Sequence, residues 1–191
     1  MPFGLARGRR ALSLLSLEHG KLAYRADFAA YGVAVAAMVL ALAIDAPRAQ
    51  DPAIALWIGA GLAAWSLIEY LFHRFLLHGM SPFREWHALH HARPTACIAS
   101  PTLFSASLIA GLVALPAWLM WGGWPACALT LGVTFGYYAY AITHHAAHHW
   151  RAAGPLARDR KRRHAAHHHA ADASRCFGVT SGIWDVVFGT L

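Results

Sequence analysis

The chain has 191 residues, of which 58% are apolar, and its mean hydropathy is +0.39. A soluble domain of this length could not bury so much apolar surface, because a small globule hides a smaller fraction of its surface than a large one. The sequence therefore predicts a single domain, residues 1–191, that lies largely within a lipid bilayer. The net charge of +7 does not indicate nucleic-acid binding, since the basic residues lie between long apolar runs.

The N-terminal 26 residues begin with the basic stretch MPFGLARGRR and continue into the short apolar run LSLLSL. This run is too short for a secretory signal peptide, and no clear cleavage site follows it. We therefore expect residues 1–26 to form an amphipathic lead-in that lies on the membrane surface.

Four apolar stretches follow, each close to the ~20 residues that a membrane-spanning helix needs. Only helices and closed barrels satisfy their own backbone hydrogen bonds in lipid, so the predicted fold class is all-α integral membrane. Pro116 predicts a kink in the third stretch, because proline removes a backbone hydrogen bond. The predicted spans are residues 28–44, 54–72, 102–121 and 125–142.

The connections between the spans predict the topology. Two are short, APRAQDP after the first span and GGW after the third, so we expect four transmembrane helices in two hairpins. The remaining segments all lie on the opposite side and hold 15 of the 16 Lys and Arg residues, every one except Arg48. The positive-inside rule places that side, with both termini, in the cytoplasm. The basic run at residues 158–163 fits an anchor to anionic headgroups or a docking face for an acidic electron-transfer partner.

The histidines share this asymmetry. Of the 14, only His19 stands alone, and the others fall in the clusters HRFLLH, HALHH, HHAAHH and HAAHHH on the predicted cytoplasmic side. Neutral imidazoles bind iron, zinc and copper, and a pair of metal ions would take roughly eight to ten of them. The sequence therefore predicts a cytoplasmic helical cap, residues 73–101 and 143–191, that carries a histidine-rich dimetal site.

Helical spacing makes the clusters usable as ligands. Positions i, i+3 and i+4 fall on one helix face at about 100° per residue. We therefore expect each HxxHH triplet to point at a single centre. The two triplets are His87, His90 and His91, and His164, His167 and His168.

The order HxxxxH, HxxHH, HxxxH and HxxHH resembles the fatty acid hydroxylase and sterol desaturase superfamily. The similarity is closest to the fatty acid 2-hydroxylases, through WSLIEYLFHRFLLH (65–78), YAITHHAAH (140–148) and FGVTSGIWDVVFGTL (177–191). It covers about residues 55–191. The resemblance implies a four-span scaffold, two iron ions, O2 and electrons from outside. Zinc binds the same ligands and could occupy a purified sample.

The resemblance also implies the ligand set and leaves His145, His149 and His169 spare. The choice of His144 over His145 depends on the preceding Thr143. The ten implied metal ligands are His73, His78, His87, His90, His91, His144, His148, His164, His167 and His168.

Unlike the larger members of the superfamily, this chain offers no room for a cytochrome-b5-like domain before Phe28. The resemblance then implies a separate electron-transfer protein, either cytochrome b5-like or a ferredoxin. The loop between the second and third spans is short, so we expect only a small cap over the substrate.

Glu69 is the candidate catalytic carboxylate. It lies one helical turn before His73, near the cytoplasmic edge of the second span. An ionisable residue at such a depth is costly and often functional, so we expect Glu69 to accept the free N–H of a ligand histidine. Snorkelling, or pairing with Arg74, is the alternative. For Asp185, a hydrogen bond within a helix or turn is the favoured role.

The tyrosines of the fourth span, Tyr137, Tyr138 and Tyr140, lie where an interfacial aromatic belt is expected, and we interpret them as that belt.

The predicted function is O2-dependent hydroxylation of a lipid, a fatty acyl chain or a related lipid, at the dimetal centre. A lipid or sterol desaturase, or a carotenoid hydroxylase, is the alternative within the superfamily, because the same oxidant serves both reactions. A membrane metal-binding protein and a zinc hydrolase are the non-oxidative alternatives. Transporters place their ligands near the bilayer midplane, and a zinc hydrolase needs only about three histidines and a carboxylate base.

Overall fold

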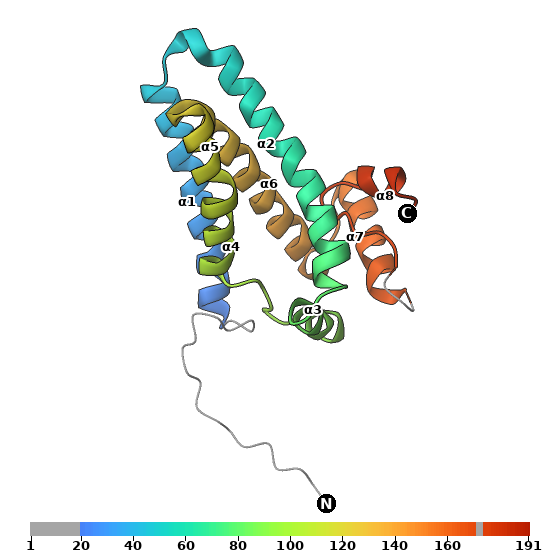
Figure 1. Ribbon diagram of the computed structural model, residues 1–191. Coiled ribbons are helices and arrows are strands. Elements are labelled where there is room, and N and C mark those ends of the chain that lie inside the picture. Colours follow the sequence, from blue (N-terminus) through green and yellow to red (C-terminus); the bar gives the residue numbers. More distant parts are fainter. Residues whose placement is uncertain (1–19, 171–173) are drawn as a thin grey trace, which may run out of the picture.

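The computed structural model describes residues 20–170 and 174–191, and the elements in these ranges are helices (Figure 1). Most of the predicted lead-in, residues 1–19, lies outside the described residues. Residues 21–26 belong to the first turns of α1 (Lys21–Asp45), which therefore begins earlier than the predicted first span.

Four helical segments are long and apolar enough to cross a membrane, as predicted. They are Lys21–Asp45, Pro52–Leu77, Thr102–Trp121 and Gly123–His149, and their mean hydropathies lie between 1.2 and 2.0. The first is α1 and the last is α6 (Gly123–His149). The second comprises α2 (Asp51–Leu71) and the π-helical segment η2 (Phe72–Leu77). The short 3-10 turn η1 (Arg48–Gln50) precedes it.

The third span is interrupted in its middle. It consists of α4 (Thr102–Ile109), a π-helical segment η3 (Ala110–Ala114) and α5 (Leu115–Trp121). Pro116 stands in the first turn of α5 and cannot donate a backbone hydrogen bond to the preceding turn. The irregular turn therefore lies immediately before the proline, where the sequence predicts a kink.

Helix α6 is the central element of the bundle. Its most extensive contacts are with α2, followed by α1 and α5. The chain reverses direction between α1 and α2 and again between α5 and α6 (Figure 1). The buried cluster of Leu42, Ala128 and Leu131 joins α1 to α6, and the rings of Trp57 and Trp121 pack nearby with centroids 4.6 Å apart.

Two glycines allow the close approach of α2 and α6. A Cβ atom on Gly61 would lie 2.3 Å from the carbonyl oxygen of Leu129, and one on Gly132 would lie 2.3 Å from that of Ile58. Small residues at such crossings let two helix backbones pack directly against each other in a membrane. This contact fixes the position of α2, which carries Glu69 and leads into His73, relative to α6, which carries His144.

The remaining helices lie at the end of the bundle opposite the α1–α2 connection (Figure 1). They are α3 (Phe83–Ala92), α7 (Gly154–His169) and α8 (Ile183–Val187). α8 contacts α2, and α7 contacts the end of α6. All four histidine clusters therefore meet at one end of the molecule.

Candidate dimetal centre

Ten histidines gather into two groups of five, and these are the ten that the resemblance implies. Within each group, one ring nitrogen from every histidine lies within 4.8 Å of the others. Histidine group 1 consists of His73, His78, His87, His91 and His167. Histidine group 2 consists of His90, His144, His148, His164 and His168.

The expectation that each HxxHH triplet faces one centre is wrong. In α3, His87 and His91 belong to group 1, whereas His90 belongs to group 2. Residues four apart differ by only about 40° around a helix, but adjacent residues differ by about 100°. The pairs at i and i+4 therefore stay together, and the third member turns to the other group. α7 behaves in the same way, so both helices contribute to both groups.

The π-helical segment η2 explains how the HxxxxH motif supplies one group. In a regular α-helix, His73 and His78 would point about 140° apart, at about 100° per residue. The i to i+5 hydrogen bonding of a π-helix brings residues five apart close to one full turn. The two rings accordingly lie with their centroids 5.2 Å apart.

The ring nitrogens converge within each group. The Nε2 atoms of His73 and His91 each lie 3.0 Å from Nε2 of His87. In group 2, Nε2 of His164 lies 2.7 Å from that of His148 and 3.1 Å from that of His168. Two nitrogens bonded to one metal at about 2.1 Å, at right angles, are separated by roughly 3 Å. The imidazole sets therefore fit a transition-metal ion in each group.

The surroundings keep these imidazoles neutral. Burial, followed by the proximity of His167 and His91, lowers the pKa of His78 to about 4. Burial is also the largest cause that lowers the pKa of His91 to about 4 and that of His90 to about 3. A neutral imidazole has a free lone pair, which is the form that binds a metal ion.

Two histidines of group 1 are oriented by backbone carbonyls. Nδ1 of His73 donates to the carbonyl oxygen of Phe177 over 2.5 Å, and Nδ1 of His167 donates to that of Arg175 over 2.8 Å. A proton on Nδ1 leaves the lone pair on Nε2, so these contacts set both the tautomer and the ring orientation.

The predicted hydrogen bond between Glu69 and a metal-binding histidine is wrong, because Glu69 bonds to the backbone. Glu69 is buried and accepts backbone N–H groups from Val179 and Thr180, at 2.7 and 2.8 Å. The hydroxyl of Thr180 donates to its second oxygen. His73 donates to the carbonyl of Phe177 and not to Glu69, because the C-terminal segment contacts both side chains. Arg74 donates to the hydroxyl of Tyr70.

The favoured role of Asp185, a hydrogen bond within a helix or turn, is wrong, because its side chain bonds to the loop that precedes α8. Asp185 is fully buried, and its two oxygens accept the backbone N–H groups of Phe177 and Gly178 at 2.8 and 2.9 Å. Thr190 donates its hydroxyl to the same carboxylate.

The three spare histidines lie outside both groups. Nδ1 of His145 is 3.1 Å from the hydroxyl of Tyr24, and its ring stacks on His149 with centroids 4.4 Å apart. His169 is exposed at the end of α7. On α6, His144 and His148 therefore face group 2, as the choice of His144 over His145 predicts.

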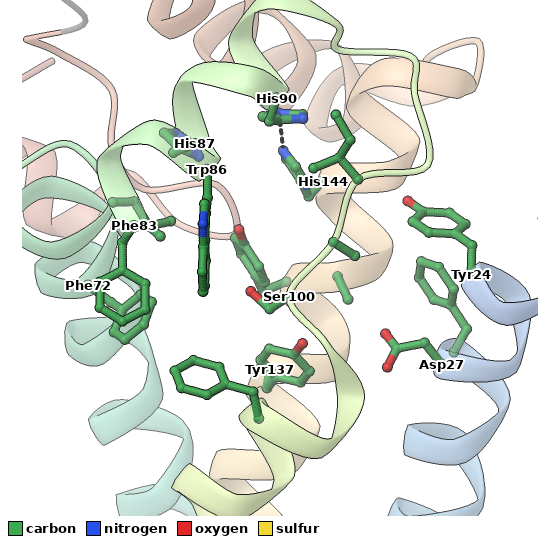
Figure 2. A pocket seen from close by; sticks show the side chains of 17 residues that line it. Tyr24, Asp27, Phe72, Phe83, Trp86, His87, His90, Ser100, Tyr137 and His144 are labelled. Carbon is green, nitrogen blue, oxygen red and sulfur yellow. Dashed lines mark hydrogen bonds between the residues drawn. The ribbon is translucent and has the colours of Figure 1, made fainter. Parts of the chain in front are cut away.

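The histidine groups border two adjoining cavities. The upper part of this region, of about 100 Å³, is lined by His87 of group 1 and by His90 and His144 of group 2, with Tyr24 and Asp27 on the side of α1 (Figure 2). The lower part, of about 170 Å³, lies among the spans and reaches His73. The two parts share the lining residues Phe72, Leu77, Ser100, Phe104, Tyr137 and Tyr140.

The sequence interpretation missed the position of Tyr137 and Tyr140, which line both cavities. Tyr140 also stacks on His144, with ring planes 4° apart. Their spacing relative to His144 and His148 contains the signal: residues 137, 140, 144 and 148 follow one face of a helix at intervals of three and four.

An all-helical bundle with four candidate membrane spans and ten convergent imidazoles at one end defines a membrane protein with a candidate dimetal centre. The family model described as fatty acid hydroxylase matches residues 58–190, and the chain belongs to this family. The resemblance in the sequence is thereby confirmed, and it places the chain in a family of oxidoreductases.

Similar proteins carry related names. The chain is 33% identical to dihydroceramide fatty acyl 2-hydroxylase FAH2 of Arabidopsis thaliana, over 73% of this chain and 62% of that protein. It is 30% identical to fatty acid 2-hydroxylase of Homo sapiens, over 78% and 42%. A solved structure of full-length scs7p, with only the hydroxylase domain visible, matches with a TM-score of 0.72 and 28% identity, over 88% of this chain and 66% of that one. The chain thus spans less than two thirds of these proteins.

Proposed function

We propose that this protein hydroxylates the acyl chain of a membrane lipid with O2, at a dimetal centre held by histidine groups 1 and 2. The observation that carries this proposal is the pair of adjoining cavities, which share six lining residues and together extend from the apolar interior of the spans to both groups. A substrate bound across the two cavities would place one carbon atom beside the metal ions and the rest of its chain among the spans.

The lower cavity suits an acyl chain. It lies between α2, the third span and α6, and most of its lining is apolar. Such a lining favours a saturated hydrocarbon and excludes water from it. Its apolar side chains include Leu108, Ile109, Leu112, Val113 and Val133.

The upper cavity suits the polar end of a lipid. Tyr24 and Asp27 line it on the side of α1, across from the aromatic side chains of Phe72, Phe83 and Trp86 (Figure 2). Thr102 donates to Asp27 over 2.5 Å, which holds the carboxylate between α1 and α4. Polar groups on one side and rings on the other would orient a lipid head, so that the adjoining chain carbons lie below His90 and His144.

The donor set supports a metal pair of the first transition series. Ten neutral imidazoles suit iron, zinc and copper, and a pair of iron ions, when bound, supplies the oxidising chemistry that an unactivated C–H bond requires. The side chains of the protein hold the ions, orient the lipid and exclude water. The electrons come from a separate protein, cytochrome b5-like or a ferredoxin.

Sidedness follows from the basic residues. The histidine-rich end, with α3, α7 and α8, faces the cytoplasm in this proposal, as do both termini, because 15 of the 16 Lys and Arg residues belong to that side. A reporter enzyme fused after Leu191 should be active in the cytoplasm. Activity only on the opposite side of the membrane would contradict the proposed topology.

Hydroxylation is preferred over desaturation because the similar proteins are named as 2-hydroxylases. A zinc hydrolase is disfavoured by the composition of the site. Among the described residues, neither histidine group includes a carboxylate that could act as a base beside the metal.

The test combines metal analysis with isotope labelling. The purified chain should contain two metal ions, and cells that express it should incorporate one oxygen atom from labelled O2 into lipid acyl chains, with the other atom reduced to water by two electrons. Cells that express His144→Ala serve as the matched control. One ion or fewer in a folded, fully loaded sample would refute the dimetal centre. New double bonds in the acyl chains, without incorporation of labelled oxygen, would favour the desaturase.

A further inference from the structure

The loop formed by residues 175–180 is held by two buried carboxylates. Four consecutive backbone N–H groups point at them. Those of Phe177 and Gly178 donate to Asp185 at 2.8 and 2.9 Å. Those of Val179 and Thr180 both donate to Oε1 of Glu69, at 2.7 and 2.8 Å. Glu69 of the second span and Asp185 of α8 thus both accept hydrogen bonds from one short stretch of backbone.

The carbonyl groups of the same loop point at the metal ligands. The carbonyl of Phe177 accepts from His73 and that of Arg175 accepts from His167, and both histidines belong to group 1. The loop therefore connects the two carboxylates to two imidazole rings, because its N–H groups bond to the former and its carbonyl groups to the latter.

The residue between these two carbonyls has a strained backbone. Cys176 has a φ of 56°, in the left-handed region that residues other than glycine rarely adopt. Its N–H donates to the carbonyl of Thr190 at 2.6 Å, and the hydroxyl of Thr190 donates to Asp185 at 2.8 Å. Such a conformation persists only where its surroundings impose it. Here it aims the neighbouring carbonyls of Arg175 and Phe177.

Three of the five rings of histidine group 2 lack such a contact at Nδ1 in the part of the chain that the structure describes. The Nδ1 atoms of His90, His164 and His168 are buried and have no hydrogen-bond partner there. The two groups therefore differ in how firmly their rings are oriented, although each supplies five imidazoles.

We infer that Glu69 and Asp185 are positioning residues for group 1, and that they make its metal ion the more slowly released of the two. This inference rests on the dimetal centre of the proposed function, but not on the reaction. Ligand orientation by surrounding hydrogen bonds typically changes metal affinity by about 10–100-fold, so the two ions should leave at clearly different rates.

The chemistry of the two carboxylates predicts different responses to amide substitution. Both oxygens of Asp185 accept backbone N–H groups, which cannot reverse their direction. An amide nitrogen at this position would face one of those donors, so Asp185→Asn breaks the loop contact. Oε2 of Glu69 accepts the hydroxyl of Thr180, a donor that can rotate and accept instead. Glu69→Gln should therefore preserve the loop, whereas Glu69→Ala should release it.

The experiment follows release of Zn²⁺ from the full-length, zinc-loaded protein to an excess of a coloured chelator. The wild-type protein should release zinc in two phases, with one ion per chain in each. Asp185→Asn and Glu69→Ala should each accelerate the slow phase by about 10–100-fold and leave the fast phase unchanged. Glu69→Gln should behave like the wild type. Either accelerating variant suffices if the other does not fold.

Ser66→Ala is the matched control. It removes the hydrogen bond from the Trp184 indole to the Ser66 hydroxyl, which joins α8 to α2 without involving residues 175–180. It should not change the slow phase. Equal acceleration of both phases, no acceleration, or the same effect from Ser66→Ala would overturn the inference. Zinc release requires no lipid oxidation, so biphasic release without oxygen incorporation would refute the proposed function alone.

Discussion

His90 and His144 lie 54 positions apart in the chain, yet their Nε2 atoms are 3.0 Å apart (Figure 2). His144 is oriented by the ring of Tyr140, which stacks on it. The next residue, His145, points instead towards Tyr24. One step along α6 thus separates a candidate ligand from a histidine that contacts the N-terminal helix.

The first prediction tests this register. His144→Ala should abolish activity and lower the metal content, because it removes a group 2 imidazole. His145→Ala should leave the metal content near normal, with at most a loss of about 10–100-fold in activity. Elemental analysis of both purified variants measures the difference. If His145→Ala removed the metal and His144→Ala did not, the ligand assignment on α6 would be wrong by one residue.

The second prediction concerns the length of the acyl chain. Val113 lines the lower cavity in the π-helical segment of the third span, far along that span from Ser100. Val113→Trp should fill this end and shift hydroxylation to shorter chains, with metal content unchanged. Leu103→Trp is the control, since Leu103 is 57% exposed on the same span and does not line the cavity. Profiling of hydroxylated lipids by chain length measures the shift; an unchanged profile for Val113→Trp would argue against this binding mode.

The third prediction concerns the crossing of α2 and α6. Gly132→Ala would place a Cβ atom 2.3 Å from the carbonyl oxygen of Ile58, so the two backbones must separate. Overpacking of this kind typically costs about 1–3 kcal/mol, and the midpoint of thermal unfolding in detergent should fall. Gly59→Ala, with nothing within 4 Å of its added Cβ, should not lower that midpoint. Equal midpoints for the two variants would contradict the tight crossing.

The four spans and the set of ten histidines could be predicted because both depend on local properties of the sequence. Length and apolar composition alone identify a membrane-spanning helix. Histidines at intervals of three, four and five residues mark helix faces, and the superfamily resemblance selects among them. Even the irregular third span is signalled locally, by Pro116.

The arrangement of those histidines into two groups depends on tertiary structure. Each HxxHH helix lies between the groups, so its triplet divides, and no property of the triplet itself reveals this. The role of Glu69 is hidden for the same reason. Its partners, Val179 and Thr180, come from a segment 110 and 111 residues away, which the position of Glu69 beside His73 does not indicate.

The last prediction concerns the stability of the metal-free protein at acid pH. Burial lowers the pKa of His78 and His91 to about 4 and that of His90 to about 3, from an ordinary value of 6.5. Below pH 6.5 the unfolded chain binds protons at these positions, whereas the folded chain does not until the pH approaches 4. The folded state therefore loses stability progressively as the pH falls from about 6.5 to about 4, and these histidines contribute no pH dependence above that range.

Thermal unfolding of the metal-free protein in detergent, measured between pH 8 and pH 4.5, should show this decline. The double variant His78→Gln, His91→Gln cannot titrate at these two positions, so its midpoint should fall less steeply over the same range. The comparison also accounts for the general effect of acid on a chain with a net charge of +7, because that effect is common to both proteins. A variant that declines as steeply as the wild type would show that these two imidazoles are not kept neutral by their burial in the folded protein.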